Sequence, residues 1–402
     1  MSADALYWVW AQLALGAGAE TDDLFGAFGT ARALYESSDY ERRISGALTS
    51  RALEKMERTH LDDARRVLEK CEALSVRVLT PEDADYPQTL HTLVNEPLAL
   101  YVQGDTRCLC ERLVIAVVGS RSATRYSFDV ARQLSRDLAK AGVVVVSGCA
   151  QGVDSAAHTG ALSVPGGKTV GVLGCGHDTR YLMENAALRT EVASNGALLS
   201  EYPPGSAASA WHFPQRNRII SGLSRGVLVV EAGEKSGSLI TARCAAEQGK
   251  DVFAVPGDLT SLTYMGSHRL IRDGAKPVFS ARDILEEYLW VYDDLRLDEL
   301  TDRPLQPLRA QPEPPKAGHS AAKQAQPEPR SAVPRALPDT MEADTKRVYA
   351  CFRDTPLYTD DLVRDTGFEP NRVFTALTEL EICGFIKMIE GKRYVLADNT
   401  NE

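Results

Sequence analysis

The chain has 402 residues, too many for a single domain of ordinary size, and its 44% apolar and 25% charged residues are typical of a globular protein. No run of 18 apolar residues occurs, which excludes a membrane-spanning helix, and the N-terminal segment lacks the basic start of a secretory signal. The eight cysteines include no Cys-x-x-Cys pair, which favours a reducing cytoplasm over a disulfide scaffold or a zinc site. We therefore expect a cytoplasmic protein without a bound metal.

The net charge of −10 is unevenly distributed along the chain. Residues 1–106 carry −8, residues 107–280 carry +5 and residues 281–402 carry −7. A cationic middle attracts an anionic ligand, and acidic flanks repel it. The overall acidity therefore does not exclude a nucleic-acid partner for the middle of the chain.

The first 73 residues have a helical pattern. Apolar residues such as Leu6, Val9 and Leu13 recur at helical spacing, and glycines separate short segments. This pattern predicts a small all-α domain over residues 1–73. Residues 74–106 change to a pattern interrupted by prolines, which we interpret as a connector.

The middle of the chain alternates between strands and helices. Helical segments such as 128–141 and 239–248 separate short apolar runs at 113–118, 143–146, 169–173, 197–199, 226–230, 251–255 and 276–279. Continuous apolar strands alternating with helices are typical of a parallel sheet covered on both faces. The sequence predicts an α/β domain over 107–290, with a Rossmann-like, doubly wound and mostly parallel sheet.

The last third of the chain divides into a linker and a small domain. Nine of the 20 prolines lie within 301–340, with few large apolar residues, so that 291–340 is predicted to be a flexible linker. Residues 341–402 show three short helical patterns followed by two apolar strands around Gly391. This order predicts a winged-helix domain.

Small and polar residues follow the predicted core strands. In an open parallel sheet, ligands bind beyond the carboxyl ends of the strands, where backbone amides and helix N-termini attract anions. Tight strand-to-helix turns also need glycine for purely structural reasons, but the repetition favours a phosphate-bearing ligand. The turns are GSR (119–121), SG (147–148), GCG (174–176), SE (200–201), EAG (231–233) and PG (256–257).

Two nucleotide-binding motifs are absent. The segment GGKT (166–169) has Leu162 where a Walker A loop needs its first glycine, and a strand rather than a helix follows it. No GxGxxG opens the first helix of the α/β domain. We expect no nucleotide or other cofactor.

The segment WHFPQRNR (211–218) is the most unusual of the chain. Two arginines around Asn217 supply phosphate-binding forks, and Trp211 and Phe213 supply rings on which bases stack. A solvated turn with ordinary surface arginines is the alternative. Downstream, Ser236 and Ser238 precede a helix, where they either cap it or present hydroxyls and amides to a phosphate.

Several motifs in one order resemble the DprA (Smf) family of bacterial DNA-processing proteins. The resemblance is dense over 75–280, looser over the N-terminal domain, which resembles the family's SAM-like, helix-hairpin-helix-type extension, and resumes over 345–396 as a winged helix. The motifs are LVIAVVGSR (113–121), SG (147–148), GVD (152–154) with His158, FPQRNRII (213–220), VEA (230–232), SGSLITA (236–242), VPG (255–257), LI (270–271) and GA (274–275).

The resemblance implies a homodimer that binds and protects single-stranded DNA independently of sequence. It also implies loading of RecA onto strands coated by single-strand-binding protein, in natural transformation and homologous recombination, without catalysis. Binding of double-stranded DNA stays open. Residue pattern and resemblance together predict DNA contacts by Gly119, Ser120, Arg121, Arg125, Ser147, Gly148, Gly174, Gly176, Phe213, Arg216, Asn217, Arg218, Lys235, Ser236, Gly237 and Ser238.

The resemblance places the dimer interface near Leu270 and Ile271, although the underside of a core helix is an equally good interpretation of these two residues. If four basic residues each neutralise one phosphate, the logarithm of affinity would fall against the logarithm of salt with a slope of roughly −3.

Two other functions compete with this one. The core resembles, more distantly, nucleotide phosphoribohydrolases, but the double glycine of their PGGxGT motif is missing at 231–238, and Asp154, His158 and Glu231 show no ordering partner. A transcription regulator would read duplex DNA with helix 370–380. The 8 basic and 12 acidic residues of 341–402 disfavour that function.

Overall fold

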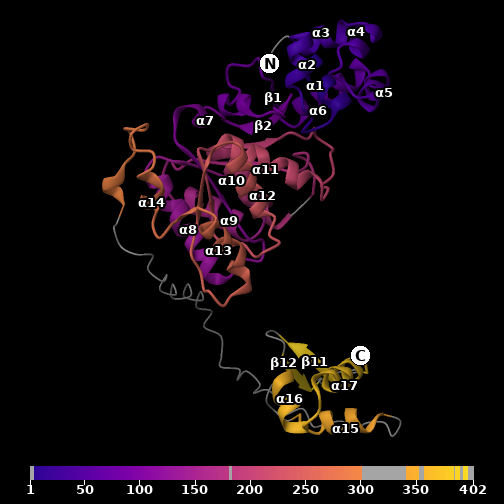
Figure 1. Ribbon diagram of the computed structural model, residues 1–402, viewed down its shortest axis with the longest axis vertical. Coiled ribbons are helices and arrows are strands. Elements are labelled where there is room, and N and C mark those ends of the chain that lie inside the picture. Colours follow the sequence, from indigo (N-terminus) through magenta and orange to yellow (C-terminus); the bar gives the residue numbers. More distant parts are fainter. Residues whose placement is uncertain are drawn as a thin grey trace, which may run out of the picture. The chain divides into compact units, whose positions relative to one another are not determined.

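The computed structural model describes residues 4–180, 183–300, 341–352, 357–383, 385–389 and 393–396. The chain forms two compact units, Met1–Gln311 and Pro312–Glu402 (Figure 1). Among the described residues, no helix is both long and apolar enough to span a bilayer.

The N-terminal part of the larger unit is helical, as predicted. Trp10, Leu24 and Leu34 are fully buried between the helices. The side chains of Thr30, Ser38 and Thr49 cap three of the helices by accepting a hydrogen bond from a backbone amide. The helices are α1 (Ala5–Leu15), α2 (Asp22–Phe28), α3 (Ala31–Glu36), α4 (Asp39–Ile44), α5 (Ser50–Arg58) and α6 (Leu61–Ala73).

A nine-stranded sheet forms the centre of the larger unit, in the order β1-β2-β6-β5-β4-β3-β7-β8-β9. The seven strands from β6 to β9 in this order are parallel. This confirms the predicted α/β fold with a mostly parallel sheet. These strands are β3 (Val114–Val118), β4 (Val144–Ser147), β5 (Thr169–Leu173), β6 (Ala197–Ser200), β7 (Gly226–Val229), β8 (Asp251–Ala254) and β9 (Lys276–Pro277).

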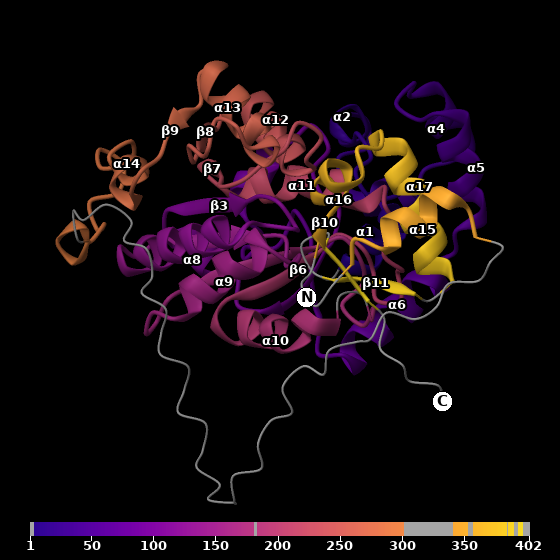
Figure 2. The same ribbon diagram turned by 90° about the horizontal axis from the view of Figure 1, so that it is seen from below.

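Helices cover both faces of the sheet (Figure 2). Side chains alternate along each strand, so that Ala116 faces α11 and α12, while its neighbours Ile115 and Val117 face α8 and α9. Because both faces are buried, most positions of the central strands are apolar, and polar residues such as Ser147, Thr169 and Ser200 stand at strand ends. The helices are α8 (Arg125–Lys140), α9 (Val153–Leu162), α10 (Ala186–Asn195), α11 (His212–Leu223), α12 (Ser238–Glu247), α13 (Met265–Arg272) and α14 (Ala281–Leu285).

The domain boundaries differ from the predicted ones on both sides of the sheet. The connector expected at 74–106 supplies β1 (Arg77–Leu79) and β2 (Leu100–Gly104), which extend the sheet in antiparallel fashion, together with α7 (Cys108–Glu111) just after it. After α14, Tyr292, Leu295 and Leu300 pack against the core, so that the first ten residues of the expected linker belong to the larger unit. Residues 301–340 lie outside the described residues.

The smaller unit has the predicted winged-helix pattern. Val348, Leu362 and Leu380 from its three helices are fully buried around one core. The antiparallel pair of β11 and β12 follows the third helix, and β10 pairs with β12. The elements are α15 (Ala343–Tyr349), β10 (Leu357–Tyr358), α16 (Thr359–Thr366), α17 (Pro370–Ile382), β11 (Ile386–Ile389) and β12 (Arg393–Leu396).

A buried ion pair joins the N-terminal helices to the sheet. Glu201, directly after β6, accepts hydrogen bonds at 2.5 and 2.6 Å from Nη2 of Arg218 on α11, and both side chains are almost fully buried. The amide of Gly18 donates to the same carboxylate at 3.0 Å, and Nε2 of Gln12 donates to the Glu201 carbonyl at 2.7 Å. Burial raises the pKa of Glu201, and the charge of Arg218 opposes that rise.

We expect Glu201→Gln to lower the free energy of unfolding by about 3–5 kcal/mol, because it leaves the buried Arg218 cation without a counter-charge. Urea denaturation followed by circular dichroism measures this loss. Asp62→Asn, which breaks an exposed ion pair with Arg65, is the control and has a much smaller effect. Equal stabilities of the two variants would contradict the role assigned to the buried pair.

Candidate functional site

A cavity of about 940 Å³ lies beyond the carboxyl ends of the strands. The turn after β3, the residues before and within α11, and the turn that leads into α12 form its walls. Its position agrees with the edge at which open parallel sheets bind ligands. Among the predicted contact residues, it is lined by Gly119, Ser120, Arg121, Phe213, Arg216, Asn217, Lys235, Ser236, Gly237 and Ser238.

Glu231 fixes the turn after β3. Its buried carboxylate accepts hydrogen bonds from the amide and the hydroxyl of Thr124, at 3.0 and 2.7 Å, and its carbonyl accepts from the amide of Ser120 at 2.8 Å. Gly119 leaves no room for a side chain, because a Cβ there would lie 2.6 Å from Cγ2 of Val153. Hydrogen bonds to Glu231, two residues after β7, thus anchor the turn that forms this cavity wall.

Arg216 lies beneath the cavity rather than projecting into it. Its side chain is buried, and Nη1 donates a 2.6 Å hydrogen bond to the carbonyl of Val172 in β5. A Cβ at Gly148 would lie 2.0 Å from the same guanidinium, so that this position needs glycine for close approach. Burial lowers the pKa of Arg216, but arginine stays protonated in proteins. The cavity floor thus carries a positive charge shielded from water.

Asp154 is the acidic residue that lines the cavity. It is buried in the first turn of α9, where Oδ2 accepts a 3.2 Å hydrogen bond from the amide of Ala150. Burial raises its pKa, and the charge of Arg216 opposes that rise. This carboxylate does not cap α9, whose N-cap residue is Gly152; it holds the backbone of the loop between β4 and the helix instead.

The rings of the WHFPQRNR segment occupy different environments. Phe213 is half-buried, and the guanidinium of Arg121 lies over its ring, 4.8 Å from the centroid. Gly174 packs closely against the same ring, because a Cβ there would lie 2.9 Å from Cδ1 of Phe213. His212 stacks on Tyr202, with centroids 4.0 Å apart. The structure therefore pairs Phe213 with one of the predicted cationic residues.

The turn before α12 brings hydroxyls and amides to the opposite side of the cavity. The hydroxyls of Ser236 and Ser238 are hydrogen-bonded to each other at 2.8 Å. Nδ2 of Asn217 on α11 donates to the carbonyl of Gly237 at 3.3 Å, which joins the two walls. The first amides of α12 are hydrogen-bonded within this turn, from Ser238 to the Ser236 hydroxyl and from Leu239 to the Ser236 carbonyl, and the helix dipole adds partial positive charge next to the exposed Lys235.

The structure does not bring all of the predicted contact residues into this cavity. Arg218 lies on another face of α11 from Arg216 and pairs with Glu201. Arg125, at the start of α8, is exposed and pairs with Asp129 at 2.9 Å. The hydroxyl of Ser147 is buried and donates to the carbonyl of Val117. Gly148 and Gly174 shape the cavity from behind Arg216 and Phe213, and Gly176 packs against the backbone of 203–205.

The residues considered for acid–base catalysis do not converge. His158 is fully buried, with ring nitrogens 3.4 Å from Sγ of Cys149 and 2.7 Å from Oγ1 of Thr169, and burial lowers its pKa to about 3. Glu231 is engaged with Thr124. Among the residues that the structure describes, no cluster of histidine, cysteine or acidic side chains is suited to a metal ion.

Leu270 and Ile271 lie on α13, and both are partly exposed. Leu270 packs against the core and also lines a second cavity, of about 860 Å³, between α12 and α13. Leu270 is thus in part a residue on the buried side of a core helix, as the alternative interpretation expects. The dimer interface at Leu270 and Ile271 stays a prediction.

Comparisons with known proteins agree on one family. A family model described as DNA recombination-mediator protein A matches residues 77–289, and one described as DprA winged helix domain matches residues 320–392. DNA processing protein DprA of Bacillus subtilis is 42% identical over 222 residues, which cover 55% of this chain and 74% of that protein. Protein Smf of Synechocystis is 35% identical over 334 residues, 81% of this chain and 82% of that protein.

The X-ray structure of DNA processing protein A (DprA) from Streptococcus pneumoniae has the same fold. It superimposes with a TM-score of 0.62 at 32% sequence identity, and the match covers 71% of this chain and 99% of that one. Sequence motifs, sheet order and the winged-helix unit thus lead to the same assignment, and the chain belongs to the DNA recombination-mediator protein A (DprA) family.

Proposed function

We propose that the cavity beyond the carboxyl ends of the strands binds single-stranded DNA independently of base sequence, without covalent chemistry. We further propose that the chain protects the strand and loads RecA onto it in natural transformation and homologous recombination. The observation that carries the binding proposal is the lining of the cavity: Arg121 and Lys235 stand at its walls, and Arg216 lies beneath its floor. RecA, single-strand-binding protein and a second copy of the chain are the partners implied by the family resemblance.

The charge distribution supports a polyanionic ligand. Among the described residues, three cations and one carboxylate, that of Asp154, line the cavity, and the N-terminus of α12 lies at its wall. A charge in a desolvated position acts over a longer range than one in bulk water, since less solvent screens it. Arg216 therefore contributes to phosphate attraction even though its side chain is buried.

The size of the cavity supports a single strand rather than a duplex. A space of about 940 Å³ is in the size range of pockets that enclose a small molecule, which suits a few nucleotide units of a single strand and not the width of a double helix. The proposed contacts of the lining side chains are to phosphates of the DNA backbone. Contacts to the backbone carry no sequence information, so that binding should not depend on base sequence.

A binding function without catalysis is supported by the arrangement of the acid–base candidates. Asp154 lines the cavity, but His158 is buried against Thr169, and Glu231 is hydrogen-bonded to Thr124. A general acid or base must reach the substrate within hydrogen-bond distance. His158 and Glu231 are engaged within the protein instead, which supports binding without catalysis.

We expect Arg121→Ala to weaken binding of an unstructured oligonucleotide about 10- to 100-fold, because it removes a charged contact to phosphate. Fluorescence anisotropy with a labelled oligo-dT measures the change. Arg125→Ala is the matched control, since Arg125 is also an exposed arginine of the same loop-and-helix region but does not line the cavity. Equal losses for the two variants, or none for Arg121→Ala, would remove the central proposal.

The salt dependence should be weaker than the sequence suggests. With Arg218 engaged by Glu201, three cations are left to neutralise phosphates, which gives a slope of roughly −2. Affinity for oligo-dT should then fall roughly 16-fold between 50 and 200 mM salt, as measured by anisotropy titrations at several salt concentrations. A slope near zero would show that the cavity does not bind the backbone.

We propose that α13 contributes to a homodimer through Ile271. Ile271→Glu should convert a dimer to a monomer in size-exclusion chromatography with light scattering, because a buried carboxylate at an interface is costly. Val94→Glu, at an apolar residue that is 63% exposed, is the control and should leave the mass unchanged. An unchanged mass for Ile271→Glu would place the interface elsewhere.

A further inference from the structure

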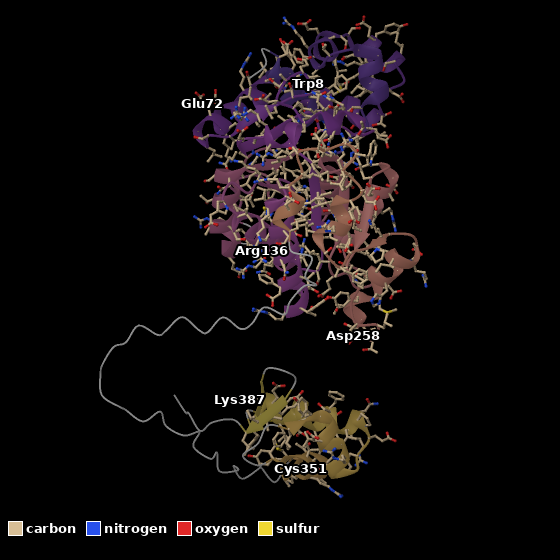
Figure 3. All side chains as sticks on the ribbon, turned by 90° about the vertical axis from the view of Figure 1, so that its left-hand side faces the viewer. Trp8, Glu72, Arg136, Asp258, Cys351 and Lys387 are labelled. Atoms are coloured by element: carbon tan, nitrogen blue, oxygen red, sulfur yellow. The ribbon has the colours of Figure 1, made fainter. Side chains whose placement is uncertain are left out.

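Trp211 is an exposed tryptophan next to the cavity. The chain has four tryptophans, and Trp8 and Trp10 are buried in the N-terminal helices, at 5% and 1% exposure (Figure 3 marks Trp8). Trp211 and Trp290 are 82% and 85% exposed, and of these two Trp211 adjoins the residues that line the cavity. Tryptophan is highly buried on average, and the place of Trp211 beside a cavity, rather than its exposure alone, is the reason to consider a ligand.

The position of Trp211 is at the lip of the cavity. Residues 208–210 before it and Phe213 and Pro214 after it line the cavity, whereas Trp211 itself does not. The chain therefore passes along the cavity wall on both sides of Trp211 while its indole faces solvent. A strand that left the cavity past residues 208–214 would run beside the indole.

The backbone that carries Trp211 is held firmly. His212 stacks on Tyr202 at 4.0 Å, and its Nδ1 lies 3.2 Å from the carbonyl of Gly174. The hydroxyl of Tyr202 donates to Oε1 of Gln215 at 3.0 Å, one turn into α11. An aromatic surface on a fixed backbone loses little conformational entropy when a planar ligand stacks on it.

Phe213, the other aromatic residue of the segment, already has a partner. The Arg121 guanidinium lies 4.8 Å from its ring centroid, and Gly174 packs against it. A base entering the cavity would have to displace Arg121 to stack there. Phe213 is thus suited to position the guanidinium that faces phosphate, and the base-stacking function falls to a different ring.

We propose that Trp211 is a stacking platform for one base of the strand at the point where the strand leaves the cavity. This inference rests on the proposed function, and it divides the contacts: phosphates bind inside the cavity, and the first base outside it stacks on the indole. Every base has a π face, so that the contact adds affinity without sequence preference.

The test compares two ligands and two tryptophan variants. Anisotropy is measured with an oligo-dT and with an abasic oligomer of equal length, which keeps the phosphates but has no bases. Trp211→Ala should bind oligo-dT roughly 5- to 150-fold more weakly than the unaltered chain, and the abasic oligomer equally well. Trp290→Ala is the matched control, because Trp290 is 85% exposed and none of its sequence neighbours lines the cavity, whereas residues on both sides of Trp211 do.

Each other outcome overturns the inference. Equal losses on both oligomers would show that Trp211 acts on the backbone or on the fold. If Trp211→Ala lost no affinity for either oligomer, the indole would not contact the strand, and another partner such as a protein would have to account for its exposure. Arg121→Ala separates this from the proposed function itself: it should weaken binding of both oligomers, and its failure to do so would reject the cavity rather than the platform.

Tryptophan fluorescence gives a second readout. In Trp290→Phe, the emission that responds to solvent comes from Trp211, since Trp8 and Trp10 are buried. Oligo-dT should quench it, whereas the abasic oligomer should have little effect. The quenching should vanish in the double variant Trp211→Phe/Trp290→Phe; quenching that persists there would contradict stacking on Trp211.

Discussion

The burial of one arginine beneath the ends of the strands determines the chemistry of the cavity. Arg216 reaches from α11 to the carbonyl of Val172 and fills the space that a side chain at position 148 would need. Burying a cation is costly unless hydrogen bonds and an opposite charge compensate. Val172 and Asp154 supply that compensation only in part, because Nε of Arg216 has no hydrogen-bond partner among the described residues. The uncompensated charge is available to an anion above it.

The geometry of α11 explains why Arg216 and Arg218, two residues apart, have different partners. An α-helix turns by about 100° per residue, so that side chains two apart point in roughly opposite directions. Arg216 therefore faces the strand ends while Arg218 faces Glu201 and the N-terminal helices. One turn of α11 thus supplies both the charge of the cavity and the ion pair that attaches the helical part of the unit to the sheet.

The sheet could be predicted from the sequence because its central strands are buried on both faces and have continuous apolar runs. β1 and β2 could not, since they are short, antiparallel and separated by prolines. The turns around the cavity could be predicted from their glycines. The two arginines of RNR (216–218) were both expected to bind phosphate, because the pattern alone does not show that they lie on a helix. Helical rotation alone would have separated Arg218 from Arg216. The roles of Thr124 and of the Tyr202–His212 stack depend on contacts between distant segments, which no local pattern reveals.

The acidity of the chain as a whole does not oppose a polyanionic ligand. In 0.15 M salt, exposed charges separated by more than about 8 Å are largely screened, so that the charges around the cavity determine local attraction. Among the described residues, these are Arg121, Arg216 and Lys235 against Asp154. Many acidic residues elsewhere are engaged in ion pairs of their own, such as Asp129 with Arg125 and Asp62 with Arg65. A net charge of −10 is thus compatible with a cavity whose own balance is positive.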